Sequence, residues 1–203
     1  MNKNVDQDMR KAILSLLDKL NTIEYINPES IPGIELYMDQ VTSFIDGQLA
    51  SSKRNEEDKL LTKTMINNYT KNDLLPPPVK KKYSKEHLLS LIFIYYLKNI
   101  VSINDIHTIL EPMTEKYFGN KDGYNFEDIY TEIFRIEKAE SQKLLKEFSK
   151  KYTIAKDTFT DFPEEDQEML QAFSFICLLS FDVYMKKQLI EKIVDDVFAT
   201  TKE

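Results

Sequence analysis

Four polar side chains between residues 64 and 71 have the chemical groups and the spacing needed to contact a base edge and its phosphate. On a helix, positions i, i+3, i+4 and i+7 share one face, and here they are Thr64, Asn67, Asn68 and Lys71. Amides and hydroxyls can bridge base edges in DNA, and an ammonium group binds phosphate. The alternative is an ordinary amphipathic helix with an asparagine-rich face in water.

The helix that would carry this polar face is predicted to begin near Thr62 and to end near Asn72. The hydroxyl of Thr62 is suited to cap the first turn. Met65, Ile66 and Tyr69 share the opposite face of the helix, so we expect them to be buried.

Three consecutive lysines, Lys80, Lys81 and Lys82, follow the triple proline at positions 76–78. Prolines restrict the chain to a few extended conformations, and Ser84 is suited to cap the next helix. The lysines are therefore expected on a short arm between two fixed points. Such an arm would hold ammonium groups against phosphates beside a groove.

The charge is distributed unevenly along the chain. The formal net charge is -7, yet eight lysines between Lys59 and Lys98 stand against only Asp73 and Glu86. That segment carries +6, so the remainder carries -7 minus +6, or -13. A local basic surface is what phosphate binding needs, because the field falls off over about 8 Å at physiological salt. The alternative is that this lysine-rich stretch is only a solvated face.

Composition and periodicity predict a mainly helical chain. Glycine occurs four times only, while residues that favour helices are plentiful. We place one domain at 1–112, with N-terminal helices and a helix-turn-helix, and a helical domain for dimerisation or effector binding at 113–203. The expected helices follow apolar repeats, and they lie near 13–20, 35–50, 62–72, 84–99, 103–110, 126–152, 163–181 and 186–198.

Several helices in this prediction depend on particular residues. Ser102 is expected to cap the helix at 103–110, and Pro112 to help stop it. The nearly continuous apolar run at 169–181 is too short to span a membrane but suits a core or dimer helix. Cys177 lies within that run, so we expect it in the core.

The sequence offers little for catalysis or metal binding. His87 and His107 are the only histidines and Cys177 the only cysteine, in no arrangement that binds zinc. Glycine-rich phosphate loops are also missing. We expect no enzyme activity, metal or cofactor. The polar N-terminus lacks the apolar core of a secretory signal, which predicts a cytoplasmic protein with no membrane partner.

Residues 61–110 resemble the DNA-binding domain of MerR-type bacterial regulators. Those domains pass from a recognition helix through a Leu-Leu-Pro-Pro-type exit and a basic wing to a Tyr-Ser helix start. The matching positions here are Ile66, Tyr69, Leu74, Leu75, Pro76, Tyr83, Ser84, Leu88, Ile103 and Ile106. The resemblance implies a mainly α, MerR-like winged helix-turn-helix with a short or vestigial wing, followed by a C-terminal helical region.

The same resemblance implies roles for individual residues. Tyr69 would approach phosphate, Asn67 would replace a recognition-helix arginine, and the lysine arm would be the wing. The chain is also similar to an uncharacterised family of bacterial proteins with a domain of unknown function, in which N-N-Y-T-K and L-P-P-P-x-K-K-K-Y are typical. That similarity implies no activity.

We therefore expect a DNA-binding transcriptional regulator that binds double-stranded DNA. The residues expected at the DNA are Lys63, Thr64, Asn67, Asn68, Tyr69, Lys71, Lys80, Lys81, Lys82 and Tyr83. Whether the C-terminal helices form a homodimer stays open at this point. The alternative function is a helical protein-interaction or adaptor module that keeps the helix-turn-helix shape without binding DNA.

Overall fold

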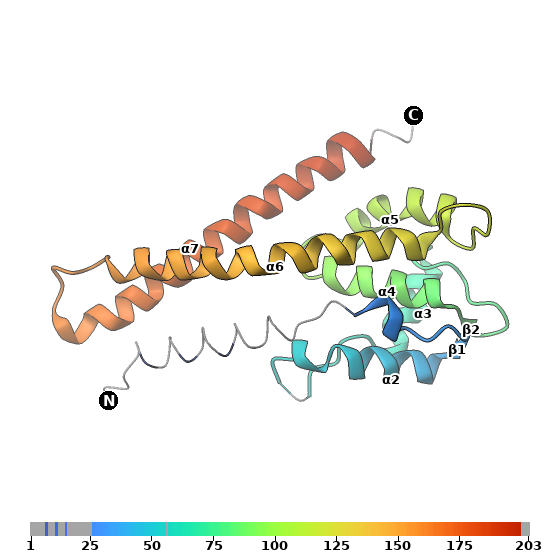
Figure 1. The fold of residues 1–203 in the computed structure, drawn as a ribbon, viewed down its shortest axis with the longest axis horizontal. Coiled ribbons are helices and arrows are strands. Elements are labelled where there is room, and N and C mark those ends of the chain that lie inside the picture. The colour runs from blue at the N-terminus through green and yellow to red at the C-terminus, as the bar shows by residue number, and fades with distance from the viewer. Residues whose placement is uncertain (1–6, 8–10, 12–14, 16–25, 56, 200–203) are drawn as a thin grey trace. The chain divides into compact units, whose positions relative to one another are not determined.

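A computed structural model describes residues 7, 11, 15, 26–55 and 57–199 of the chain (Figure 1). The helix expected near 13–20 lies outside the described residues. Two compact units are present, one of Tyr25–Arg135 with Ile190–Glu203 and the other of Ile136–Leu189 with Met1–Glu24. The division of domains between residues 112 and 113 stays a prediction.

The described chain is mainly helical, as predicted. Its α-helices are α2 (Met38–Gln48), α3 (Lys63–Lys71), α4 (Lys85–Leu97), α5 (Ile103–Tyr117), α6 (Phe126–Lys156) and α7 (Glu164–Ile193). Short 3-10 helices are η1 (Pro28–Ser30) and η2 (Ala50–Ser52), and η3 (Val194–Phe198) is a short π-helix. Its one described sheet pairs β1 (Leu36–Tyr37) with β2 (Lys82–Tyr83) in antiparallel fashion.

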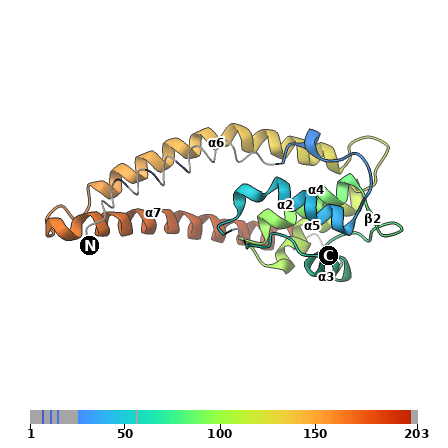
Figure 2. The same cartoon turned by 90° about the horizontal axis from the view of Figure 1, so that it is seen from below.

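The helix α4 forms the centre of the first unit, among α2, α3 and α5 (Figure 2). Its sequence is apolar on nearly every side, and Leu88, Leu89, Leu91, Ile92 and Ile94 are fully buried. Each such side chain contributes about 1.5–3 kcal/mol relative to an exposed position. The helix therefore packs on several neighbours at once.

The first turns of α6 complete this core. Phe126 and Tyr130 are buried, and the ring of Phe93 from α4 contacts both, at centroid distances of 6.0 and 5.3 Å. The Tyr130 hydroxyl also donates a hydrogen bond of 2.7 Å to the carbonyl of Ile26. Farther along α6, Ile133 and Ile136 are exposed.

The helix α2 begins three residues later than the sequence indicated. Leu36 pairs with Tyr83 and Tyr37 with Lys82, so these two N-terminal residues join the sheet. Tyr37 is exposed at the N-cap of α2. Val41 and Ile45, one helical turn apart, are buried. A strand contact with residues far along the chain therefore overrides the local helical pattern.

The helix α5 extends beyond Pro112, so the prediction that this proline helps to stop the helix was wrong. Proline removes one N–H from the backbone ladder, but the helix continues to Tyr117. The Ser102 cap is confirmed, because the Ser102 hydroxyl accepts from the Asp105 N–H at 3.1 Å.

The long helix α7 differs most from its prediction. Pro163 precedes it as expected, but the apolar run at 169–181 is largely exposed, and Cys177 is exposed rather than in the core. Between Glu164 and Ile193, the buried residues of α7 are Gln171 and Phe175. The stretch Glu164–Phe198 is also long and apolar enough to cross a membrane by length and composition.

Candidate nucleic-acid interface

The helix α3 holds its polar face outward through well-defined ends. The Thr62 hydroxyl caps the start by accepting from the Met65 N–H at 3.2 Å, as predicted. After the last turn, Asp73 adopts a left-handed conformation (φ 58°), and the N–H groups of Leu74 and Leu75 donate to the Tyr69 carbonyl. Both leucines are buried, so the helix is anchored at its C-terminal end.

The two faces of α3 divide as the spacing predicted. Ile66 is fully buried and Tyr69 is 7% exposed, while the polar face remains in solvent. The exposed residues of that face are Thr64, Asn67, Asn68 and Lys71. They present one hydroxyl, two amides and one ammonium group on a helix whose backbone is fixed by the core.

The lysine arm is a tight β-hairpin. Val79 and Lys82 exchange two backbone hydrogen bonds, of 3.1 and 2.9 Å, which leaves Lys80 and Lys81 as the two residues of the turn. Both have positive φ, 51° and 64°. Two positive φ values in a two-residue loop define a type I′ turn, which asparagine and glycine normally occupy.

This turn places lysines where the backbone disfavours them. A left-handed conformation costs a non-glycine residue roughly 1–2 kcal/mol, and residues held this way cluster at functional sites. Lys80 and Lys81 are exposed and make no ion pair with the described residues. Their ammonium groups are therefore available at the tip of the hairpin.

Two other lysines of the expected interface have acidic partners. Lys63 of α3 forms an ion pair with Asp39, and Lys82 lies 3.8 Å from Glu35 and 5.7 Å from the centre of the Tyr37 ring. Both contacts are to the β1–α2 junction, so α3 and the hairpin meet the same short segment. Sequence reasoning missed Glu35 and Asp39, because the pairing connects distant parts of the chain.

Some lysines of the basic stretch have structural roles. Lys85 binds Glu127 at 2.7 Å. Lys98 donates to the Leu60 carbonyl at 2.6 Å and lies over the Tyr95 ring, and burial lowers the pKa of Lys98. The exposed basic surface is therefore smaller than the count of eight lysines suggested. Its exposed members outside ion pairs with described residues are Lys59, Lys71, Lys80 and Lys81.

The two tyrosines of the predicted interface lie in the core. Tyr69 is 7% exposed and Tyr83 is 4% exposed. Burial raises the pKa of both phenols, so they stay protonated at neutral pH. Their main visible role is to support the exposed groups, Tyr69 beneath the polar face of α3 and Tyr83 within the hairpin strand β2.

His87 supports the base of the hairpin. Its Nδ1 accepts from the Ser84 N–H at 3.0 Å, and its ring packs edge-on against Tyr83 and Phe118. Burial lowers the pKa of His87, although the nearby carbonyls of Pro76 and Pro77 oppose that change. Its Nε2 is buried without a hydrogen-bond partner among the described residues. The neutral ring therefore fits this position.

An open depression of about 330 Å³ lies between α2 and the start of α3. Its lining includes Thr42, Ser43, Lys59 and Lys63. Thr42 and Ser43 were not among the residues predicted at the site. In the described part of the chain, no group of three histidine, cysteine, aspartate or glutamate residues could hold a metal ion.

These features define a mainly helical protein that presents a polar helix and a lysine-tipped hairpin on one core. The chain belongs to the family of the domain of unknown function DUF1836, whose model matches residues 26–133. That segment contains α3, the hairpin and the packed core around α4. No curated protein and no solved structure matches the chain.

Proposed function

We propose that this protein is a DNA-binding transcriptional regulator that reads duplex DNA with the exposed face of α3. The observation that carries the proposal is the pairing of this face with the type I′ turn at Lys80 and Lys81. Both elements contact the β1–α2 junction, through Lys63 and Lys82. A polar helix with a basic hairpin supports a winged helix-turn-helix of MerR-like kind, in which α2 and α3 form the helix pair.

The size and the chemistry of α3 suit the major groove. An α-helix with its side chains is about 10–12 Å in diameter, and the major groove is about 12 Å wide. Asn67 and Asn68 would read base edges, for which adenine is the usual partner of an asparagine amide. Thr64 and Lys71 would contact base or backbone atoms at the two ends of the same face.

The hairpin would supply sequence-independent affinity. Lys80 and Lys81 would neutralise two phosphates beside the groove and release their counterions. Tyr69 and Tyr83 would act by positioning these groups, since both are buried. Asp39 and Glu35 would weaken the contribution of their lysine partners, because a carboxylate beside a phosphate raises the local negative potential.

The test is fluorescence anisotropy of the full chain on pooled random duplex DNA over a salt series. The key variant replaces Lys80 with asparagine and Lys81 with glycine, which removes both charges and retains the turn geometry. We expect weaker binding to every sequence and a salt slope reduced by about 2. The matched control replaces the exposed Lys116 and Lys121 of the same unit with asparagine and should leave binding unchanged.

A second variant tests reading of bases. Asn67→Ala should change which sequences are selected from a random pool while preserving the salt slope, because an amide contributes no counterion release. If the folded wild-type protein does not bind duplex DNA at low salt, the regulator proposal fails. That result would favour the alternative of a protein-interaction or adaptor module.

A further inference from the structure

The helix α7 carries a continuous uncharged stripe on the side facing away from α6. At 100° per residue, seven exposed residues fall within one sector of the helix between positions 169 and 184. They are Met169, Phe173, Ile176, Cys177, Ser180, Val183 and Tyr184. Met169, Phe173, Ile176, Ser180 and Val183 follow one another at spacings of four and three residues, as in a helix–helix seam.

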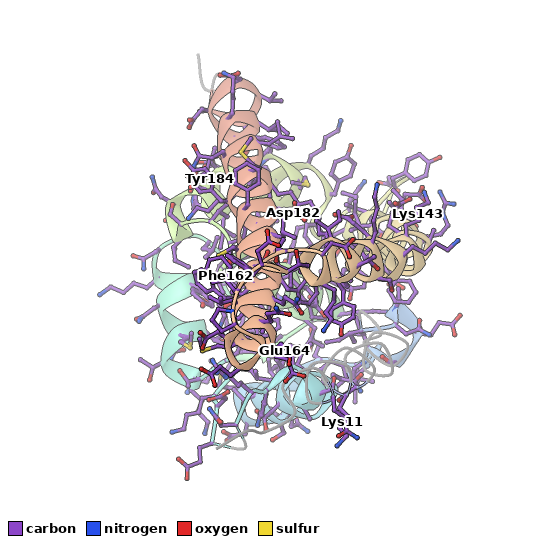
Figure 3. All side chains as sticks on the ribbon, turned by 90° about the vertical axis from the view of Figure 1, so that its left-hand side faces the viewer. Lys11, Lys143, Phe162, Glu164, Asp182 and Tyr184 are labelled. Carbon is purple, nitrogen blue, oxygen red and sulfur yellow. The ribbon has the colours of Figure 1, made fainter. Side chains whose placement is uncertain are left out.

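The opposite side of α7 is already occupied by α6 of the same unit. The Gln171 side chain donates to the Thr158 carbonyl at 3.2 Å, the ring of Phe175 meets that of Tyr152 at 5.8 Å, and Asp182 forms an ion pair with Lys151. Figure 3 shows Asp182 on the side of α7 near α6 and Tyr184 on the other side. The stripe is therefore the face that α6 does not cover.

We infer that this stripe binds the same stripe of a second copy of the chain, with the two α7 helices antiparallel. Pairing around a two-fold axis between residues 176 and 177 places Phe173 opposite Ser180 of the second copy. It also places Met169 opposite Tyr184. Large side chains then meet small or flexible ones, which is the complementarity that close packing requires. Parallel pairing would set Phe173 against itself and leave a gap at Ser180.

The exposed area is sufficient for such a contact. Phe173 and Tyr184 are 61% and 57% exposed, which leaves on the order of 100 Å² uncovered on each. Met169, Ile176 and Val183 are 58–66% exposed. The stripe therefore offers about 500 Å² per copy and about 1,000 Å² for a pair, the lower limit for a specific interface.

The contacts between α7 and α6 favour a second copy of the chain, rather than a lipid bilayer, as the partner that covers the stripe. In the segment that packs on α7, α6 carries Glu147, Lys150 and Lys151, and Asp182 of α7 is held by this polar helix. Inserting α7 into lipid would either carry these charges with it or break the Asp182 ion pair, both at high cost. Covering the stripe with an identical stripe requires neither. This inference is independent of DNA binding.

The first test is sedimentation equilibrium of the full chain from about 1 to 100 µM, the range expected for a small interface. The wild-type chain should dimerise reversibly. Ile176→Glu should weaken association at least tenfold, whereas Met185→Glu, an exposed α7 residue outside the stripe, should not. Circular dichroism would establish that both variants stay helical. A wild-type monomer throughout this range, or a dimer unaffected by Ile176→Glu, would overturn the inference.

The second test uses Cys177 as a built-in reporter. A short bismaleimide should link Cys177 to Cys177 of the second copy in the wild-type dimer. With Cys177→Ser as background, a mixture of Met169→Cys and Tyr184→Cys chains should link more readily than either chain alone. Preferential linking of Met169→Cys chains to one another would overturn the antiparallel arrangement.

The third test addresses lipid directly. The wild-type protein is mixed with phosphatidylcholine–phosphatidylglycerol vesicles and floated on a density gradient. We expect the protein to remain in the dense fraction. Flotation that is abolished by Ile176→Glu would assign the stripe to a membrane surface and overturn the inference.

Discussion

The helices α4 and α7 have similar apolar character but opposite environments. Residues 88–95 of α4 are almost all buried because α2, α3, α5 and α6 surround them. The apolar positions of α7 meet α6 along one side and are otherwise exposed over most of their length. A run of apolar residues therefore indicates that a surface needs to be covered, and the rest of the fold determines whether the same chain covers it.

The largest expected change in the free energy of unfolding comes from a substitution in α4. Leu89→Ala should reduce the free energy of unfolding by about 2–5 kcal/mol, because the side chain is fully buried and its loss leaves a cavity. Phe173→Ala in α7 should change it by less than about 0.5 kcal/mol in dilute protein. Urea denaturation followed by circular dichroism measures both. Similar losses in the two variants would contradict the difference in burial.

Lys80 and Lys81 of the hairpin turn are also not the residues that would stabilise the fold most. Replacing Lys80 with asparagine and Lys81 with glycine should raise the free energy of unfolding by about 1–2 kcal/mol, since both positions are left-handed. The proposed function requires the same variant to lose affinity for DNA. Lys80→Ala with Lys81→Ala is the control, because alanine removes the charges without relieving the backbone. Equal stabilities of the two double variants would show that the turn is unstrained.

The stability of the fold is expected to depend on pH through His87, in the first turn of α4. Because burial lowers the folded-state pKa of His87, the unfolded chain binds a proton first as pH falls below about 6.5. Stability should then fall by up to about 1.4 kcal/mol per pH unit until the folded pKa is reached. His87→Gln keeps an oxygen that can accept from the Ser84 N–H and should remove this dependence between pH 6.5 and 5.

Glu86 also contributes to the pH dependence of stability. Burial raises the pKa of Glu86, so that group favours the folded state as pH falls and opposes the effect of His87 at lower pH. The useful quantity is the difference between wild type and His87→Gln, measured by urea denaturation at each pH. His107→Gln provides the control at the half-exposed histidine. An unchanged pH profile in His87→Gln would exclude the proposed cause.

The smallest effect is expected at the β1–α2 junction. Asp39→Asn should change stability by less than about 0.5 kcal/mol, because both partners of the Lys63 ion pair are exposed. It should strengthen DNA binding several-fold by freeing Lys63 for phosphate. Anisotropy on random duplex DNA measures this gain. The control is Asp122→Asn, an exposed substitution elsewhere in the unit that removes the same charge. It should increase the affinity for DNA clearly less than Asp39→Asn does.

Local signals in the sequence predicted much of the unit that contains α4. The Thr62 and Ser102 caps depend on contacts three residues away, and the burial of Ile66 depends on helical spacing alone. The start of α2 was predicted too early because Leu36 pairs with Tyr83, a partner 47 positions along the chain. Pro112 was misjudged because a proline does not end every helix.

The candidate site was predictable to a similar degree. The exposed face of α3 followed from periodicity, and the lysine arm followed from the prolines before it. Its type I′ geometry did not, because Lys80 and Lys81 are not the residues that this turn normally selects. The ion pair between Lys63 and Asp39 joins two helices, so no local pattern could reveal it. The exposure of α7 was hidden because periodicity shows which residues share a face but not what covers that face.

The hydrogen bond from Tyr130 to the Ile26 carbonyl has a consequence for synthesis. Its partners are 104 positions apart, and the family match at 26–133 spans both. A ribosome adding about 5–20 residues per second needs roughly 5–20 s to pass from one to the other. During that interval the apolar side chains of α4 emerge before α6 can cover them. The nascent chain therefore exposes its most hydrophobic helix until the last part of the domain has been made.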